Sequence, residues 1–300
     1  MRFNIFTQLS ALLVCLVISL SVGQSTSYGQ PLVDTEWLRA NLKDESTVIL
    51  DIRPNRNYVA GHVPGAISAP YGRGWRKTVD GVIGMLPPVD EIEAFIQSLG
   101  VDNKERVVLL PHGNSSTDFA AATRIYWTFK VLGHDQVSIL DGGYKAWIAG
   151  SGELETKATL PEPGTFNAEF RPELVTSQSD VRAALETSVN LVDARPASQY
   201  KGETKSRVVK RLGTIPNASN MVHSNFYDAE NALFSSKSDV DQLSITSVTK
   251  PNEKTVTFCN TGHWASIAWF ALSEIAGKKD VSLYDGSMTE WAADDANPVQ

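Results

Sequence analysis

Residues 48–54, Val-Ile-Leu-Asp-Ile-Arg-Pro, return as residues 190–196, Asn-Leu-Val-Asp-Ala-Arg-Pro. Two more stretches repeat in the same order: Gly-His-Val-Pro-Gly-Ala at 61–66 matches Gly-Thr-Ile-Pro-Asn-Ala at 213–218, and Val-Ser-Ile-Leu-Asp-Gly-Gly at 137–143 matches Val-Ser-Leu-Tyr-Asp-Gly-Ser at 281–287. Landmarks that recur in one order at a spacing of about 145 residues indicate a tandem duplication, because solenoid repeats are far shorter. The sequence therefore predicts two domains of one fold.

Each half alternates short apolar runs with helix-like stretches. Residues 106–110 and 255–258 have strand character, whereas residues 89–99, 118–131 and 265–276 have helical character. This alternation predicts an α/β fold in which each domain is a parallel sheet with helices on both faces. We expect domain 1 at 30–150, a linker at 151–172 that is rich in proline and lacks apolar periodicity, and domain 2 at 173–300.

The amino terminus has the pattern of a targeting segment. Arg2 is followed by an uncharged apolar stretch at 9–22 and by small residues, so residues 1–23 are predicted to be a cleaved signal peptide. The apolar run is too short for a comfortable membrane span, so we expect a periplasmic or secreted protein without stable membrane association. The net charge of −7 also argues against nucleic acid as a partner.

Cysteine usage points to a reactive thiol. The chain has two cysteines, and Cys15 lies inside the predicted signal peptide, so the mature protein would contain Cys259 alone. Exported proteins usually pair their cysteines in disulfides, so a single free thiol requires a reason. A buried, inert cysteine is the alternative interpretation.

Cys259 follows the strand-like run 255–258 directly and precedes a helix-like run that begins near Ala265. In an open parallel sheet, ligands bind at the carboxyl ends of the strands. A loop that turns from a strand into a helix presents several backbone N–H groups and favours a thiolate or a persulfide anion over the neutral thiol. The expected substrate-binding residues are Asn260, Thr261, Gly262, His263, Trp264 and Ala265.

These motifs resemble the tandem-domain rhodanese family: the paired Asp-x-Arg strand ends, Gly-His-Val-Pro-Gly-Ala, Asp-Gly-Gly followed by tryptophan, and Cys-x-x-Gly-x-x-Ala. The resemblance implies two rhodanese-like domains, of which the first, lacking a cysteine, is non-catalytic. It implies a sulfurtransferase in which Cys259 takes the outer sulfur of thiosulfate or a similar donor, becomes a persulfide, and passes the sulfur to cyanide or a thiol. A 3-mercaptopyruvate sulfurtransferase and a persulfide carrier for an exported partner remain alternatives.

The sequence departs from this family at an anion-binding position. Where the family has a substrate-binding arginine, four residues beyond the Arg of Asp-x-Arg, this chain has Gln199. The candidate replacements in the second half are Arg207, Lys210 and Arg211. From the first half, Arg73 and Arg76 are weaker candidates. A solvated basic loop is the alternative for the cluster at 207–211.

Other cysteine chemistries lack their required partners. A phosphatase of the Cys-x5-Arg type needs an arginine where this chain has Ala265, and a thioredoxin-like site needs a second cysteine where it has Gly262. The five histidines have no metal-ligand spacing, so no metal and no cofactor are predicted. The expected partners are a small sulfur donor and a thiophilic acceptor.

Overall fold

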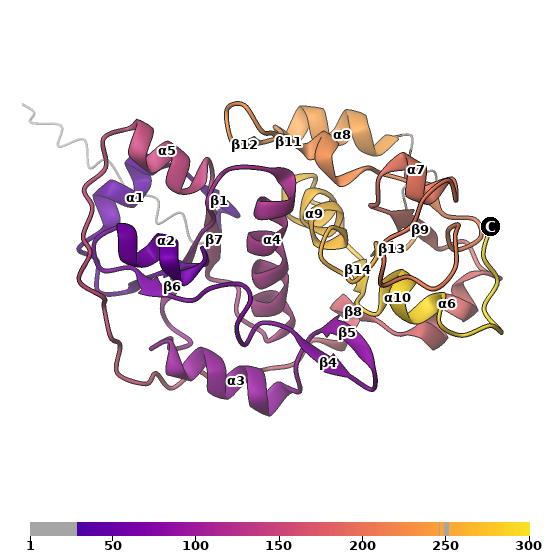
Figure 1. Cartoon of the computed structure of the whole chain (residues 1–300), viewed down its shortest axis with the longest axis horizontal. Helices are drawn as coiled ribbons and strands as arrows, with labels where there is room; N and C mark the ends of the chain where they lie inside the picture. The colour runs from indigo at the N-terminus through magenta and orange to yellow at the C-terminus, as the bar shows by residue number, and fades with distance from the viewer. Residues whose placement is uncertain (1–28, 246, 249–251) are drawn as a thin grey trace, which may run out of the picture.

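A computed structural model describes residues 29–245, 247–248 and 252–300. The predicted signal peptide at 1–23 lies outside the described residues. The chain forms two α/β domains side by side, the first indigo to magenta and the second orange to yellow in Figure 1. No helix within the described ranges is both long and apolar enough to cross a membrane.

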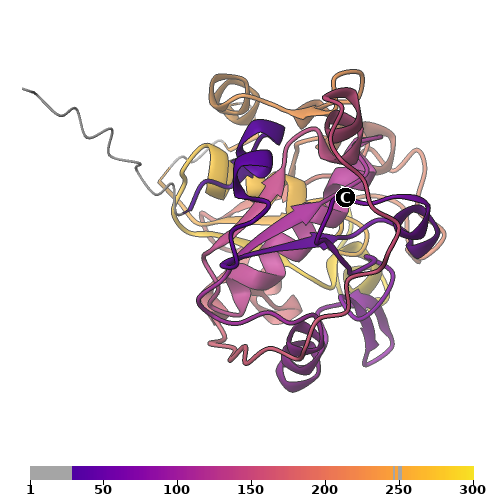
Figure 2. The ribbon, with the colours of Figure 1, turned by 90° about the vertical axis from the view of Figure 1, so that its left-hand side faces the viewer.

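Domain 1 is built on a five-stranded parallel sheet with the strand order β1-β7-β6-β2-β3. Figure 2 looks toward this domain and shows its strands lying between helices. Its elements are β1 (Leu32–Val33), α1 (Thr35–Asn41), β2 (Thr47–Asp51), α2 (Asn55–Ala60), β3 (Ile67–Ser68), β4 (Lys77–Val79), β5 (Val82–Met85), α3 (Val89–Ser98), β6 (Arg106–Leu110), α4 (Ser116–Val131), β7 (Val137–Leu140) and α5 (Gly143–Ala149). The central strands are apolar runs because both faces of the sheet are covered.

Domain 2 repeats the arrangement with the strand order β8-β14-β13-β9-β10, also parallel. Its elements are β8 (Val175–Thr176), α6 (Gln178–Ala184), β9 (Asn190–Asp193), α7 (Ala197–Tyr200), β10 (Ser219–Asn220), β11 (Tyr227–Asp228), β12 (Leu233–Phe234), α8 (Lys237–Ile245), β13 (Thr255–Phe258), α9 (Ala265–Phe270), β14 (Val281–Tyr284) and α10 (Ser287–Trp291). Short 3-10 turns at Pro172–Leu174 and His223–Phe226 and a π turn at Ala271–Ile275 complete it. Matching strand orders confirm the predicted fold and its duplication.

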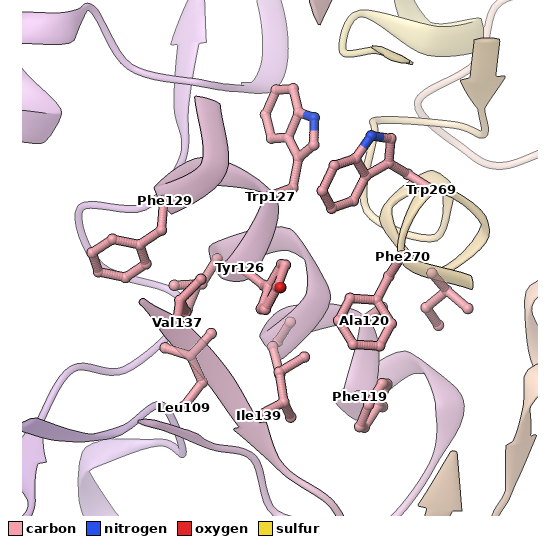
Figure 3. Close-up of a cluster of buried hydrophobic side chains, with 14 of the residues drawn as sticks. Leu109, Phe119, Ala120, Tyr126, Trp127, Phe129, Val137, Ile139, Trp269 and Phe270 are labelled. Atoms are coloured by element: carbon pink, nitrogen blue, oxygen red, sulfur yellow. The ribbon is translucent and has the colours of Figure 1, made fainter. Parts of the chain in front are cut away.

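Helix α4 of domain 1 packs against α9 of domain 2 and joins the two cores. Figure 3 shows Phe119 and Tyr126 of α4 with Trp269 and Phe270 of α9, and the rings of Tyr126 and Phe270 meet edge to face at 5.0 Å between centroids. Nearly every side chain of α4 is buried, because one side faces its own sheet and the other faces domain 2. One buried hydrophobic cluster therefore spans both domains, and each domain also has a smaller cluster of its own.

Each domain also extends a two-stranded hairpin to the Asp-Gly motif of the other. The Leu86 N–H, next to hairpin β4–β5, donates to Oδ2 of Asp285 at 2.7 Å. The Phe234 N–H, in hairpin β11–β12, donates to Oδ1 of Asp141 at 2.9 Å. The repeated aspartates thus hold the domains together in a nearly symmetric way.

The segment between the sheets runs along the surface of domain 1. Phe166 inserts fully into the domain 1 core, the Gly164 N–H donates to the carbonyl of Gln97, and the Arg171 N–H donates to the carbonyl of Val131. Because these contacts continue as far as Arg171, the chain leaves domain 1 immediately before Pro172.

The repeated Asp-x-Arg motifs form the same buried ion pair in both domains. Arg53 Nη2 lies 2.6 Å from Asp51 Oδ2 and 2.9 Å from the Gly61 carbonyl. Arg195 Nη2 lies 2.6 Å from Asp193 Oδ2 and 2.9 Å from the carbonyl of Gly213. Since each arginine ties a strand end to the following Gly landmark, the motif has a structural role.

We predict that Arg195→Met will lower the free energy of unfolding by about 3–5 kcal/mol, because it leaves the Asp193 carboxylate buried and uncompensated. Arg53→Met should cost a similar amount in domain 1. Urea denaturation would measure both, with the exposed Arg56→Met as the control, expected within about 0.5 kcal/mol of wild type. A loss below about 1 kcal/mol for both buried variants would contradict the structural role.

Candidate active site

Cys259 sits at the carboxyl end of β13, the central strand of its sheet, as the sequence predicts. Cys259 as a whole is only 1% exposed to solvent. Its carbonyl accepts the Met288 N–H at 3.0 Å, and the Asn260 carbonyl accepts the Thr289 N–H at 2.9 Å. The Asp-Gly-Ser landmark and the start of α10 therefore support the cysteine loop, by which we mean residues 259–264.

The Ser287 hydroxyl holds the cysteine loop in place by hydrogen bonds. Its Oγ accepts the N–H groups of Cys259 at 3.1 Å and Gly262 at 3.0 Å, and donates to the Tyr284 carbonyl at 2.9 Å. Its φ of +50° is left-handed, a conformation that non-glycine residues rarely adopt. The hydrogen bonds of the hydroxyl compensate for this strain.

Several backbone N–H groups of the loop are left for a ligand. Within the described residues, the N–H groups of Asn260, Thr261, His263, Trp264 and Ala265 have no acceptor. They cluster around Cys259 and the start of α9, where helical peptide dipoles favour negative charge. This arrangement can stabilise a sulfur anion without a side-chain cation in contact.

Domain 1 holds the outer side of the cysteine loop. Arg76 Nη2 donates to the Thr261 carbonyl, and Arg76 Nε donates to the Gly84 carbonyl at 2.7 Å. Trp264 Nε1 donates to Thr117 Oγ1 at 3.1 Å. Domain 1 therefore shapes the loop that carries the cysteine.

His263 links the two domains as a neutral ring. Its Nε2 lies 3.0 Å from the Thr117 carbonyl, which can only accept, so Nε2 carries the proton and Nδ1 accepts from the Tyr71 hydroxyl at 2.8 Å. Burial, aided by the nearby charge of Arg76, lowers the pKa of His263 to about 3. His263 is therefore a positioning residue rather than an acid–base group at neutral pH.

Arg124 and Asp285 form a buried ion pair beneath the loop, with Nη1 and Oδ1 2.6 Å apart. Burial alone would lower the pKa of Arg124, but its attraction to Asp285 raises it, so the guanidinium keeps its charge. A Cβ on Gly262, whose φ is +73°, would stand 2.4 Å from Arg124 Nη1 and 2.8 Å from Asp285 Oδ1. Only glycine fits here, because both the conformation and the space exclude a side chain.

Of the basic residues predicted to bind substrate, some lie at the cysteine loop and others lie away from it. Arg76 contacts the loop, whereas Arg73 is exposed and lines a cavity beside α3 that does not include any loop residue. Arg207 is exposed and makes no hydrogen bond or ion pair with the described residues. Arg211 donates to the carbonyls of residues 291, 292, 294 and 297, and Lys210 lies 3.4 Å from Asp295, so both serve the carboxyl-terminal segment.

Position 199 does lie at the loop. Gln199 Oε1 accepts the Asn260 side-chain amide at 2.9 Å, so the residue that replaces the family arginine contacts the residue after the cysteine. A neutral amide here leaves Arg76 of domain 1 as the positive charge next to the loop, because the charge of Arg124 is balanced by Asp285. Elsewhere, no group of three or more His, Cys, Asp and Glu side chains in the described ranges could hold a metal ion.

Sequence reasoning missed Arg124, Tyr71 and Thr117. Arg124 is the one charged residue in the stretch 119–129 of α4, and a charge within such an apolar-rich stretch is the signal that could have been noticed, since a buried arginine needs a partner. Tyr71 and Thr117 carry no comparable signal. Their partners are residues far along the chain that only the packing of the two domains brings near.

The cysteine at a strand end, the loop of unpaired N–H groups and the duplicated parallel sheet are the features of a tandem rhodanese protein. The model of the rhodanese-like domain matches residues 34–150 and 177–294, so the chain belongs to this family. It is 30% identical to thiosulfate/3-mercaptopyruvate sulfurtransferase 1 of Arabidopsis thaliana, over 92% of this chain and 79% of that protein. It is 29% identical to the 3-mercaptopyruvate sulfurtransferase of Escherichia coli, over 89% and 97%.

Solved structures agree with this assignment. The crystal structure of SseA from Escherichia coli, described as a 3-mercaptopyruvate sulfotransferase, superimposes with a TM-score of 0.75 at 26% identity. The match covers 86% of this chain and 98% of SseA. The predicted family and fold are thereby confirmed.

We predict that Gly262→Ala will reduce sulfur transfer at least about tenfold, because the methyl group would displace Arg124 and Asp285 and move the loop. Gly277→Ala is a matched control: its φ is +74°, but a Cβ there meets nothing within 4 Å. Both variants carry the same backbone strain of about 1 kcal/mol, so equal activities would show that crowding at Gly262 is unimportant. Steady-state kinetics and thermal melts would measure the two effects.

Proposed function

We propose that this protein is a thiosulfate sulfurtransferase that works through a persulfide on Cys259. The observation that carries the proposal is the set of unpaired N–H groups around Cys259 at the carboxyl end of β13. The names of its relatives support sulfur transfer from thiosulfate or 3-mercaptopyruvate.

In the first half-reaction, the Cys259 thiolate attacks the outer sulfur of thiosulfate. The S–S bond of thiosulfate breaks, sulfite leaves with the electron pair, and Cys259 becomes a persulfide anion. In the second, cyanide or a thiolate attacks the outer sulfur of the persulfide and the cysteine thiolate leaves. The loop N–H groups stabilise the anion of each stage because their dipoles are fixed in place.

Thiosulfate is favoured over 3-mercaptopyruvate by the chemistry around Gln199. A carboxylate is best bound by the two parallel N–H groups of an arginine, which Gln199 cannot offer. The sulfonate end of thiosulfate is tetrahedral, and backbone N–H groups at a helix start can hold such a group. The charge of Arg76, which contacts the cysteine loop, supports an anionic donor in either case.

Cys259→Ser should abolish transfer from thiosulfate to cyanide while leaving the fold intact, because serine cannot form the persulfide. Wild-type protein treated with thiosulfate should gain the mass of one sulfur atom on Cys259, measured by intact-mass spectrometry. The same assay with 3-mercaptopyruvate should give a lower kcat/KM. Residual activity of the serine variant near that of wild type would refute the covalent route.

A mass gain without turnover would instead identify a persulfide carrier. A kcat/KM for 3-mercaptopyruvate above that for thiosulfate would reverse the donor assignment. A gain with neither donor would mean that another sulfur compound is the donor.

We also propose that the protein is exported, on the basis of the signal-like pattern at residues 1–23. Amino-terminal sequencing of protein recovered from the cells that make it should find a terminus at or soon after Gly23. Recovery of an intact terminus from the cytoplasmic fraction alone would contradict export.

A further inference from the structure

A cavity of about 560 Å³ lies in domain 1 against the cysteine loop of domain 2. Its walls come from the ends of β2 and β3, the start of α4 and one residue of the loop: Ile52, Pro54, Pro70, Tyr71, Gly72, Asn114, Ser115, Thr117, Asp118, Ala121 and His263. The volume suits a small organic molecule. The carboxyl ends of parallel strands are also where such folds bind ligands.

The cavity shares a wall with the cysteine loop. Tyr71 and His263 are half-buried, face the cavity and are hydrogen-bonded to each other at 2.8 Å. Burial raises the pKa of Tyr71, and the negative charge of Cys259 acts in the same direction. The positive charges of Arg76 and Arg124 lower it by less, so the hydroxyl of Tyr71 stays protonated. A molecule in the cavity therefore contacts Tyr71 and His263, which lie next to the sulfur site.

The chemistry of the walls differs from that around Cys259. Most of the lining is apolar, and the one charged side chain in it is Asp118, whose Oδ2 accepts the Gly113 N–H at 2.7 Å. No lysine or arginine lines the cavity, and His263 is neutral. Arg76 and Arg124, by contrast, contact Thr261 and Asp285 of the sulfur site.

We propose that this cavity binds the sulfur acceptor, and that the acceptor is a small organic thiol that carries no negative charge apart from that of its reacting thiolate. The inference rests on the proposed function, because it requires a persulfide on Cys259. The acceptor thiolate attacks the outer sulfur, the S–S bond to Cys259 breaks with its electron pair going to Cys259, and the acceptor leaves as a persulfide. An apolar wall and one carboxylate favour a neutral or cationic body over an anionic one.

The test compares three thiols of similar size, 2-mercaptoethanol, cysteamine and 3-mercaptopropionate, with cyanide as a reference acceptor and thiosulfate as donor. The expected result is a kcat/KM for the neutral and cationic thiols at least about tenfold above that for the anionic thiol, after correction for thiolate fraction. Equal rates, or preference for 3-mercaptopropionate, would overturn the proposal.

Gly72 offers a way to fill the cavity without strain, since its φ is not left-handed and a Cβ there meets nothing within 4 Å. Gly72→Leu should lower the ratio of kcat/KM for cysteamine to that for cyanide about tenfold. Ser98→Leu, an exposed substitution in the separate cavity beside α3, is the matched control and should leave the ratio unchanged. An unchanged ratio in Gly72→Leu would refute acceptor binding here.

Asp118→Asn tests the charge, because the amide oxygen can still accept the Gly113 N–H. It should narrow the discrimination against 3-mercaptopropionate; a discrimination as large as that of wild type would refute the role of the carboxylate. Intact-mass measurement of the persulfide distinguishes a failure of this inference from a failure of the proposed function. A normal wild-type persulfide with no thiol discrimination would sink this inference alone, whereas no persulfide would overturn the proposed function and this inference with it.

Discussion

The buried ion pair between Arg124 and Asp285 is the interaction on which the site depends. Arg124 comes from α4 of domain 1, and Asp285 begins the Asp-Gly-Ser motif of domain 2. The second oxygen of the same carboxylate accepts the Leu86 N–H. Because Ser287, two residues further on, accepts two N–H groups of the cysteine loop, domain 1 fixes the loop through this motif. The position of the sulfur thus depends on the contact between domains.

Duplication explains how one half became the support of the other. The Tyr144 N–H donates to the Pro111 carbonyl in domain 1 as the Met288 N–H donates to the Cys259 carbonyl in domain 2, so Pro111 occupies the position of the cysteine. Gly143 matches Ser287 and has a similar φ of +56°. A Cβ on Gly143 would lie 2.5 Å from the Pro111 carbonyl oxygen, so this half has no room for the serine. Domain 1 therefore lacks both the nucleophile and the hydroxyl that would organise its loop.

The sequence allowed the fold and the cysteine to be predicted because their signals are local. Strand-like runs, repeated landmarks and a cysteine between a strand and a helix are visible within short windows. The residues that contact the loop could not be predicted in this way. Arg124 lies more than a hundred residues before Gly262, and no local pattern pairs them. Arg211 is a case in which a local pattern was present but pointed elsewhere. Its basic cluster near the expected position suggested substrate binding, whereas its guanidinium donates hydrogen bonds to carbonyls between residues 291 and 297.

The site places its charged side chains one layer away from the sulfur, and this suits a two-stage reaction. In the proposed mechanism the same loop has to hold a thiolate, a donor anion and a persulfide in turn, and these differ in size and charge. A guanidinium in direct contact would favour one of them and slow its departure, because differential binding sets the rate of each step. Backbone N–H groups are fixed by the fold and can bind each anion in turn, while Arg76, whose partners are carbonyl oxygens, supplies a positive field and the charge of Arg124 is balanced by Asp285. A glutamine at position 199 is therefore compatible with sulfur transfer, since Arg76 of domain 1 places a positive charge at the cysteine loop.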